Sequence, residues 1–255
     1  MFSSHRVEAA SMRENIVQQL LGHAQESCSS GRAVDIGRAT FTTTLNLLPL
    51  KASSANNDVL DGLLNLDKQH DHELSSNDVR HLLVDLFSAG TDTTSSTVEW
   101  AMAELLNNPN LMAKARSELG KVVGKEKMVE ESDISKLLIY KQYAKNAHVL
   151  VNVWAIGRDS TIWSNPNSFV PERFLECEID VKGRDFQLIP FGAGRRICPG
   201  LLLGHRMVHL MLASLLHSFD WKLEDGLKPE DMDMTEKFGF TLRKAQPLQA
   251  VPIKP

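Results

Sequence analysis

A helical pattern of about 30 residues constrains the fold of this chain more than any other feature. It starts at Asn77, behind a serine N-cap (Ser75 or Ser76), and runs to about Asn107, where an Asn-Pro pair ends it. At the usual rise per residue such a helix measures roughly 45 Å. We therefore expect one helix that is long enough to cross a whole domain.

The middle of this helix carries a polar run, Ala89-Gly90-Thr91-Asp92-Thr93-Thr94. Gly and Thr are poorer helix formers than Ala or Leu, so the pattern weakens the helix at one place. Gly90 leaves room for a small ligand, Thr93 offers a hydroxyl to a distal oxygen or a water, and Asp92 can relay a proton. The plainer interpretation is a helix kinked by threonine hydroxyls that bond back to the preceding turn.

The rest of the chain predicts more helices and a few strands. The spacing of apolar residues indicates helices at 7–30, 35–50, 59–66, 110–123 and 201–219. The β-branched run at 148–153 is the best strand candidate, and short strands are expected at 238–242 and 248–251. The predicted fold class is therefore mainly α with a small β portion.

Composition excludes several classes of protein. The chain has 255 residues, 42% hydrophobic and 24% charged, with a net charge of −4, which is typical of a soluble globular protein. A nucleic-acid binder would carry a basic excess, so none is expected. Cys28, Cys177 and Cys198 are too scattered for a disulfide framework, and the first two are expected to be free thiols without a role. The longest apolar stretch, 201–219, is broken by His and Arg, so no transmembrane helix is expected.

The most informative segment is F-G-A-G-R-R-I-C-P-G at residues 191–200, directly ahead of an apolar helix. Gly192 and Gly194 allow positive φ angles and close approach to a bulky neighbour. Pro199 suits the first helical position, which predicts Cys198 as the N-cap, facing the positive end of the helix dipole. Two adjacent arginines stabilise its thiolate further, as a metal ligand requires. The cysteine alone favours a buried structural residue, but the complete pattern favours the ligand.

This segment matches F-x-x-G-x-R-x-C-x-G, the cysteine-loop signature of the cytochrome P-450 family, and the whole chain resembles a haem-thiolate monooxygenase. The fixed positions of the signature are Phe191, Gly194, Arg196, Cys198 and Gly200. The polar run at 89–94 matches the family's A/G-G-x-D/E-T-T/S motif, and 171–174 matches its P-E-R-F segment. Residues 41–48 and 149–159 are similar to a plant branch of the geraniol hydroxylase type.

The resemblance implies roles for the residues of the cysteine loop. Cys198 would be the axial thiolate ligand of a haem b iron, and Arg196 would pair with a haem propionate. Phe191 would pack near the ligating sulfur. Gly200 would allow close approach to the ring, and Gly194 would belong to the same cofactor-binding loop.

The resemblance also implies the reaction. Thr93 and Asp92 would be the catalytic residues, serving oxygen activation and proton delivery, and Gly90 would leave space at the cofactor. The expected reaction is O2-dependent hydroxylation of a small hydrophobic, terpenoid substrate, with electrons from an NADPH-dependent reductase. Residues 1–255 would form a single partial P-450 domain. The family sits on the endoplasmic reticulum membrane; without its N-terminal anchor this chain is expected to be soluble in the cytoplasm or peripheral.

One departure from the family bears on the chemistry: no Glu of the chain is followed by Arg three positions later. The family's E-x-x-R pair should lie between 132–137 and 145–148, where only residues 138–144 stand. Arg173 would then lack its implied partner, and a second gap is expected near 49–53. The alternative function is therefore a catalytically inactive remnant that binds haem weakly or not at all. A helical scaffold without cofactor would leave the conjunction of motifs unexplained.

The last long helix carries two histidines at a spacing that can bind zinc, His205 and His209. No third ligand is in view, so we expect a polar stripe on a packed helix. Met207, Met211 and Trp221 are expected to belong to the core rather than to a cofactor site.

Overall fold

The computed structural model describes residues 2–50, 76–124, 127–130, 133, 152–175, 178–194, 197–239 and 241–255. Its helices are α1 (Phe2–Ser30), α2 (Ile36–Leu50), α4 (Ser76–Asn107), α5 (Pro109–Val122), α7 (Val153–Ile156) and α8 (Leu201–Ser218), with 3₁₀ turns at Pro171–Phe174 (η3), Glu224–Gly226 (η5) and Pro229–Asp231 (η6). Its strands are β1 (Val34–Asp35), β2 (Asp220–Leu223), β3 (Glu236–Lys237), β4 (Arg243–Lys244) and β5 (Gln249–Ile253). The expected fold class, mainly α with a small β portion, is confirmed.

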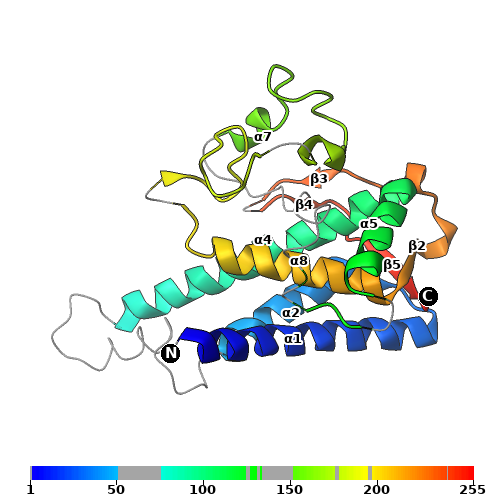
Figure 1. The fold of residues 1–255 in the computed structure, drawn as a ribbon, viewed down its shortest axis with the longest axis horizontal. Coiled ribbons are helices and arrows are strands. Elements are labelled where there is room, and N and C mark those ends of the chain that lie inside the picture. Colours follow the sequence, from blue (N-terminus) through cyan, green and yellow to red (C-terminus); the bar gives the residue numbers. More distant parts are fainter. Residues whose placement is uncertain are drawn as a thin grey trace.

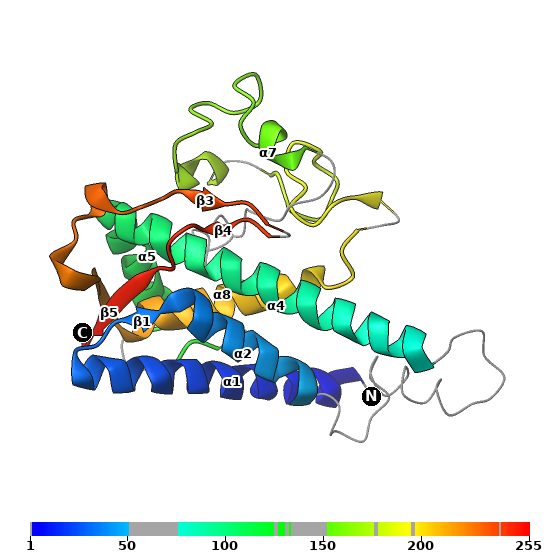
Figure 2. The same cartoon turned by 180° about the vertical axis from the view of Figure 1, so that it is seen from behind.

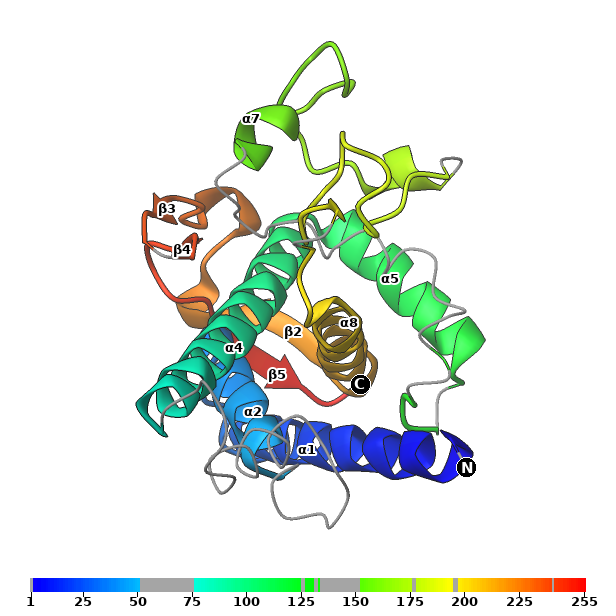
Figure 3. The same ribbon diagram turned by 90° about the vertical axis from the view of Figure 1, so that its left-hand side faces the viewer.

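Helix α8 forms the centre of the core. Every residue from Met207 to Leu216 is buried, as expected of a helix that is apolar on nearly all sides. The helix packs against α1, α4 and α5. Figure 3 shows α8 almost end-on, with α4 and α5 on its two sides and α1 beneath it. Met207 and Met211 lie in this core and Trp221 packs against it, which confirms their prediction.

A small antiparallel sheet lies at the end of the helical bundle where α1 ends (Figures 1 and 2). Its strand order is β1-β5-β2, so the C-terminal strand β5 lies in the middle and pairs with a strand on each side. Ala250 in β5 is the register partner of both Val34 in β1 and Leu223 in β2, and all three side chains are buried. Because β5 also contacts α1, the sheet ties both ends of the chain to the same core.

Helix α4 runs from Ser76 to Asn107 without a break, so the polar run does not interrupt it. The hydroxyls of this run donate to carbonyls one turn earlier: Thr91 to Phe87 O at 2.7 Å and Thr94 to Gly90 O at 2.8 Å. Such hydrogen bonds from threonine hydroxyls to the preceding turn are what the sequence predicted as the alternative to a catalytic role. Within a helix held on several sides by tertiary contacts, weak propensity over a few residues is not sufficient to end it.

One predicted strand is wrong, and another lies mostly outside the described residues. Val153, the last residue of the run 148–153, begins α7, because the Asn152 side chain accepts a hydrogen bond from Ala155 N at 3.0 Å and caps a helical turn. Residues 148–151 lie outside the described residues, as does the predicted helix 59–66. The prediction at 238–242 is wrong: these residues connect β3 to β4, and the strands lie on either side of them.

Residues 152–175 and 178–194 form an irregular layer over the C-terminal half of α4 (Figures 1 and 2). An ion pair fastens this layer to α5, between Lys114 Nζ and Glu172 Oε1 at 2.8 Å. The chain leaves the layer through the cysteine loop and enters α8. In the described part of the chain, no helix combines the length and the apolar character that crossing a membrane would need.

Candidate functional site

The cysteine loop is a closed turn built on two left-handed glycines. Gly192 has φ of 72° and Gly194 has φ of 65°, as the sequence predicted. The chain folds back far enough for Cys198 N to donate to Phe191 O at 2.9 Å, and Ile197 N donates to Gly194 O at 3.2 Å. The loop therefore holds the cysteine by backbone hydrogen bonds that do not depend on its side chain.

Cys198 lies ahead of α8 but is not its N-cap. The N-cap is Gly200, and the helix begins at Leu201. Leu201 N donates to Cys198 O at 3.2 Å, which is a turn, and the first bond of helical spacing runs from Gly204 N to Gly200 O at 2.8 Å. The prediction of Cys198 as the N-cap is wrong, because residues 198–201 form a tight turn and the helix starts at the end of that turn. The thiol is free and half-buried.

One glycine lies beside this sulfur and another beside the Phe191 ring. A Cβ at Gly200 would lie 3.7 Å from Cys198 Sγ, in contact with it. A Cβ at Gly204 would lie 3.7 Å from Phe191 Cε1, so the Phe191 ring packs over the first turn of α8. Arg196 lies outside the described residues.

Gly183 is a residue that sequence reasoning missed. It has φ of +77°, and a Cβ there would lie 2.7 Å from Gly192 O and 3.0 Å from Ala193 Cα. Both neighbours are backbone atoms of the cysteine loop, so this glycine lets the preceding loop press directly on it. No local pattern marks Gly183, because the contact depends on which segment lies opposite.

On α4, the predicted catalytic residues have partners within the protein. The Thr93 hydroxyl donates to Ala89 O at 2.6 Å. The Asp92 carboxylate pairs with Arg243 Nη2 in β4 at 2.5 Å. At Gly90 an added Cβ would meet no atom within 4 Å. Arg243 was not predicted, because it is far from Asp92 in sequence and belongs to no motif.

The ion pair is one of several bonds that fasten residues 241–248, here called the C-terminal strap, to one side of α4. Leu242 O accepts hydrogen bonds from Ser96 Oγ at 2.8 Å and from Trp100 Nε1 at 3.1 Å. Leu248 N donates to Glu99 Oε1 at 2.9 Å. Burial raises the pKa of Glu99, and this backbone hydrogen bond opposes the rise.

An apolar groove of about 720 Å³ lies between α2 and the first half of α4. Its walls include Phe41, Phe87 and Thr91, and Asp92 lies among its lining residues. At about 100° per residue along a helix, Thr93 lies on the opposite side of α4 from Thr91 and Phe87. The groove therefore does not face the hydroxyl that the family motif assigns to oxygen activation.

The P-E-R-F segment forms the 3₁₀ turn η3. The Arg173 guanidinium donates to three backbone carbonyls: Nε to Val170 O at 3.1 Å, and Nη2 to Asn165 O at 3.0 Å and Ser168 O at 2.9 Å. The arginine therefore binds the backbone of its own loop. The resemblance to the family implies a carboxylate partner instead.

The two histidines of α8 are packed against each other. Their ring centroids lie 4.2 Å apart in a stacked arrangement, and His209 Nδ1 lies 2.6 Å from His205 O. His209 is fully buried, so the predicted polar stripe continues into the core. No group of three potential metal ligands was found among the described residues.

Comparison with known proteins identifies the family. The sequence model of the family "Cytochrome P450" matches residues 3–145 and 142–249. A "Geraniol 8-hydroxylase" of Swertia mussotii is 40% identical over 357 aligned residues, covering 98% of this chain and 72% of the relative. "Cytochrome P450 monooxygenase 76AD131" of Lophophora williamsii is 40% identical over 362 residues, 99% of this chain and 72% of the relative. "Cytochrome P450 76C1" of Arabidopsis thaliana is 53% identical over 228 residues, 78% of this chain and 44% of the relative.

The family match is discontinuous in the region where the E-x-x-R pair is missing. The family match consists of two segments that meet at 142–145. The alignments of 357 and 362 residues are longer than the chain's own 255, so the relatives carry internal residues with no counterpart here. The matched residues nonetheless include both the cysteine loop and the α4 motif. The chain belongs to the cytochrome P450 family, in the plant branch whose members include geraniol 8-hydroxylases.

Proposed function

We propose that this chain is a haem-thiolate monooxygenase that hydroxylates a small hydrophobic, terpenoid substrate with O2 and electrons from an NADPH-dependent reductase. The observation that carries the proposal is the free Cys198 thiol, held by a closed glycine loop at the entry to α8. Two relatives named geraniol 8-hydroxylase support the terpenoid class of substrate. Residues 1–255 would act as a single partial P450 domain.

The residues around Cys198 fit the haem that the family implies. The sulfur is half-buried and in no disulfide, and Gly200 places no side chain against it. Cys198 would hold the iron, Arg196 would pair with a propionate, and the Phe191 ring would shield the sulfur. When bound, a thiolate-ligated haem supplies the activation of O2 for insertion of one oxygen atom into the substrate.

Thr93 and Asp92 would supply hydrogen bonding and a proton from α4. The Thr93 proton points to Ala89 O, which leaves the oxygen lone pairs of Thr93 as acceptors for a water or another donor. Asp92 would relay a proton after its ion pair with Arg243 opens. The Arg243 side chain is 51% exposed, so water can solvate its guanidinium when the pair opens.

The second candidate, an inactive remnant, is favoured by a different observation. The Arg173 guanidinium donates to backbone carbonyls of its own loop. It therefore does not connect the segment ahead of the cysteine loop to a carboxylate on another helix, as the family's E-x-x-R pair would. The break in the family match at 142–145 falls where that element would stand. In this alternative the cysteine loop folds but holds haem weakly or not at all.

The ferrous–CO difference spectrum of the purified chain, reconstituted with haemin, tests the proposal. A strongly red-shifted Soret band that disappears in Cys198→Ala is expected from thiolate ligation. Cys28→Ala is the matched control, because it removes a half-buried free thiol outside the loop and should leave the band unchanged. No bound haem, or a band typical of histidine ligation, would overturn the proposal in favour of the remnant.

Turnover separates the two candidates once haem is bound. The chain is incubated with geraniol, NADPH and a plant P450 reductase, and hydroxylated product is measured against NADPH consumed. We expect hydroxylated product from the wild type and none from Cys198→Ala. Thr93→Ala should form less product and consume more NADPH per molecule of product. Haem binding without product from geraniol or related monoterpenols would identify a haem-binding remnant.

A further inference from the structure

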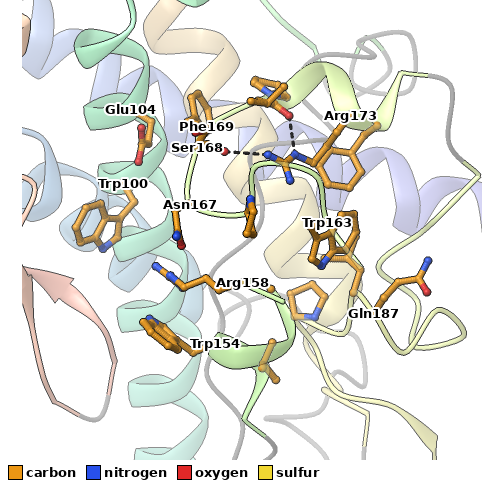
Figure 4. A pocket seen from close by; sticks show the side chains of 18 of the residues that line it. Trp100, Glu104, Trp154, Arg158, Trp163, Asn167, Ser168, Phe169, Arg173 and Gln187 are labelled. Atoms are coloured by element: carbon orange, nitrogen blue, oxygen red, sulfur yellow. Dashed lines mark hydrogen bonds between the residues drawn. The ribbon is translucent and has the colours of Figure 1, made fainter. Parts of the chain in front are cut away.

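A second cavity, of about 430 Å³, lies on the other side of α4 from the apolar groove. Its walls are the C-terminal half of α4 on one side and the irregular layer that contains α7 on the other. Figure 4 shows Trp100 and Glu104 on α4 opposite Trp154, Arg158 and Asn167 of that layer. Its volume is in the range of small-molecule sites.

Aromatic rings in fixed positions line this cavity. Trp100 Nε1 donates to Leu242 O at 3.1 Å and Trp163 Nε1 donates to Ile156 O at 3.1 Å, so both indole rings are held by the backbone. Trp163 also packs on Phe174, with ring centroids 5.6 Å apart. The faces of such rings carry partial negative charge, which attracts cations.

The two arginines of the wall already have hydrogen-bond or ion-pair partners within the protein. Arg158 lies over the Trp154 ring, 4.3 Å from its centroid, and pairs with Glu236 at 3.4 Å. Arg173 donates to three backbone carbonyls. Arg158 has a carboxylate partner, whereas the Arg173 guanidinium keeps its charge and donates these hydrogen bonds to the backbone of its own loop.

Glu104 is the group that needs a partner. Its side chain takes part in no hydrogen bond or ion pair within the described part of the chain, and burial raises its pKa. Lys244 attracts it from a distance, but Lys244 Nζ is bound to Asp233 O and lies over the Trp100 ring. A partly buried carboxylate without a partner is unfavourable, and a bound cation would relieve that cost.

We propose that this cavity binds a small organic cation, with a quaternary or primary ammonium group at the Glu104 carboxylate and its apolar body against the Trp100 and Trp154 rings. In such a site the carboxylate attracts the charged group, and the indole rings bury the apolar body. This binding does not require haem, so its test is independent of the proposed oxygenase function.

The test compares choline with its neutral isostere 3,3-dimethylbutan-1-ol by isothermal titration calorimetry on the purified chain. The two molecules share a shape and differ in charge. We expect choline to bind at least tenfold more tightly than the neutral molecule, and Glu104→Gln to remove that preference. Trp154→Ala should weaken the affinity for choline about two- to tenfold, because one aromatic wall is lost. Trp154 is 49% exposed, so the variant should fold.

Glu230→Gln is the matched control, because Glu230 is exposed and does not line the cavity. It should bind choline as the wild type does. Circular dichroism of each variant establishes that it is folded. Equal affinity for choline and its isostere, undiminished choline binding in folded Glu104→Gln, or no choline binding by the folded wild type at millimolar concentrations would each overturn the proposal.

Discussion

At the scale of single residues, the cysteine loop depends on close backbone contacts that only glycine permits. Gly183 approaches Gly192 O and Ala193 Cα in a left-handed conformation. Gly37 plays a similar part elsewhere, since a Cβ there would lie 2.7 Å from Glu99 Oε2. In both cases a missing side chain lets two segments of the chain touch.

Gly183→Ala should destabilise the chain by about 1–3 kcal/mol, because the new Cβ meets backbone atoms and the φ angle disfavours Ala. Urea unfolding followed by circular dichroism measures the loss. Gly120→Ala is the control: Gly120 is exposed in α5 with open space around it, so Ala should raise stability by about 0.5–1 kcal/mol. Equal stability of Gly183→Ala and wild type would contradict the close approach.

At the scale of elements, α4 has two sides with different partners. Its apolar side, with Val98, Met102 and Leu105, lies in the core. Its other side carries the polar groups that hold the C-terminal strap, together with the partly buried carboxyls of Glu99 and Glu104. A helix that buries carboxyls in this way should make stability depend on pH.

Glu104→Gln should therefore flatten the dependence of stability on pH. Burial raises the pKa of Glu104, so the folded chain binds this proton better than the unfolded chain. Its contribution to stability is complete below the usual carboxyl pKa and is lost as pH rises through the folded value. The variant should be more stable than wild type at neutral pH, and the difference should vanish in acid.

Urea unfolding at several values from about pH 4 to about pH 8 measures this effect. The exposed Glu230→Gln should follow the wild-type curve at every pH. A Glu104→Gln variant that is less stable than wild type at neutral pH would show that the carboxylate is stabilised where it lies.

At the scale of the whole molecule, α8 connects the core to the candidate site. Its buried residues hold it among α1, α4 and α5, and its first turn follows the cysteine loop directly. The loop's position relative to α4 therefore rests on the packing of α8.

Leu212→Ala should cost about 2–5 kcal/mol, because Leu212 is 1% exposed and its removal leaves a cavity. On the same helix, Leu202 is 67% exposed, and Leu202→Ala should change stability by about 0.5 kcal/mol or less. Thermal and urea unfolding measure both variants. Similar losses in the two would contradict the central position of α8.

Much of this architecture was predictable, because the signals are local. Apolar spacing indicated the long helices, and Gly192 and Gly194 have the positive φ angles that their loop predicted. The strand positions in the C-terminal tail were less predictable. Residues 238–242 have strand-like composition, yet pairing occurs on either side of them, because a strand is decided by its partner.

By itself, the sequence determined the order of the helices, the buried character of α8 and membership of the P450 family, since periodicity and motif spacing are properties of neighbouring residues. Only the tertiary structure decided that Asp92 pairs with Arg243, that Glu99 accepts a hydrogen bond from Leu248 N and that Glu104 faces an aromatic cavity. Those facts depend on which distant segments meet, and the meeting is decided by packing of the whole chain around α8 and α4.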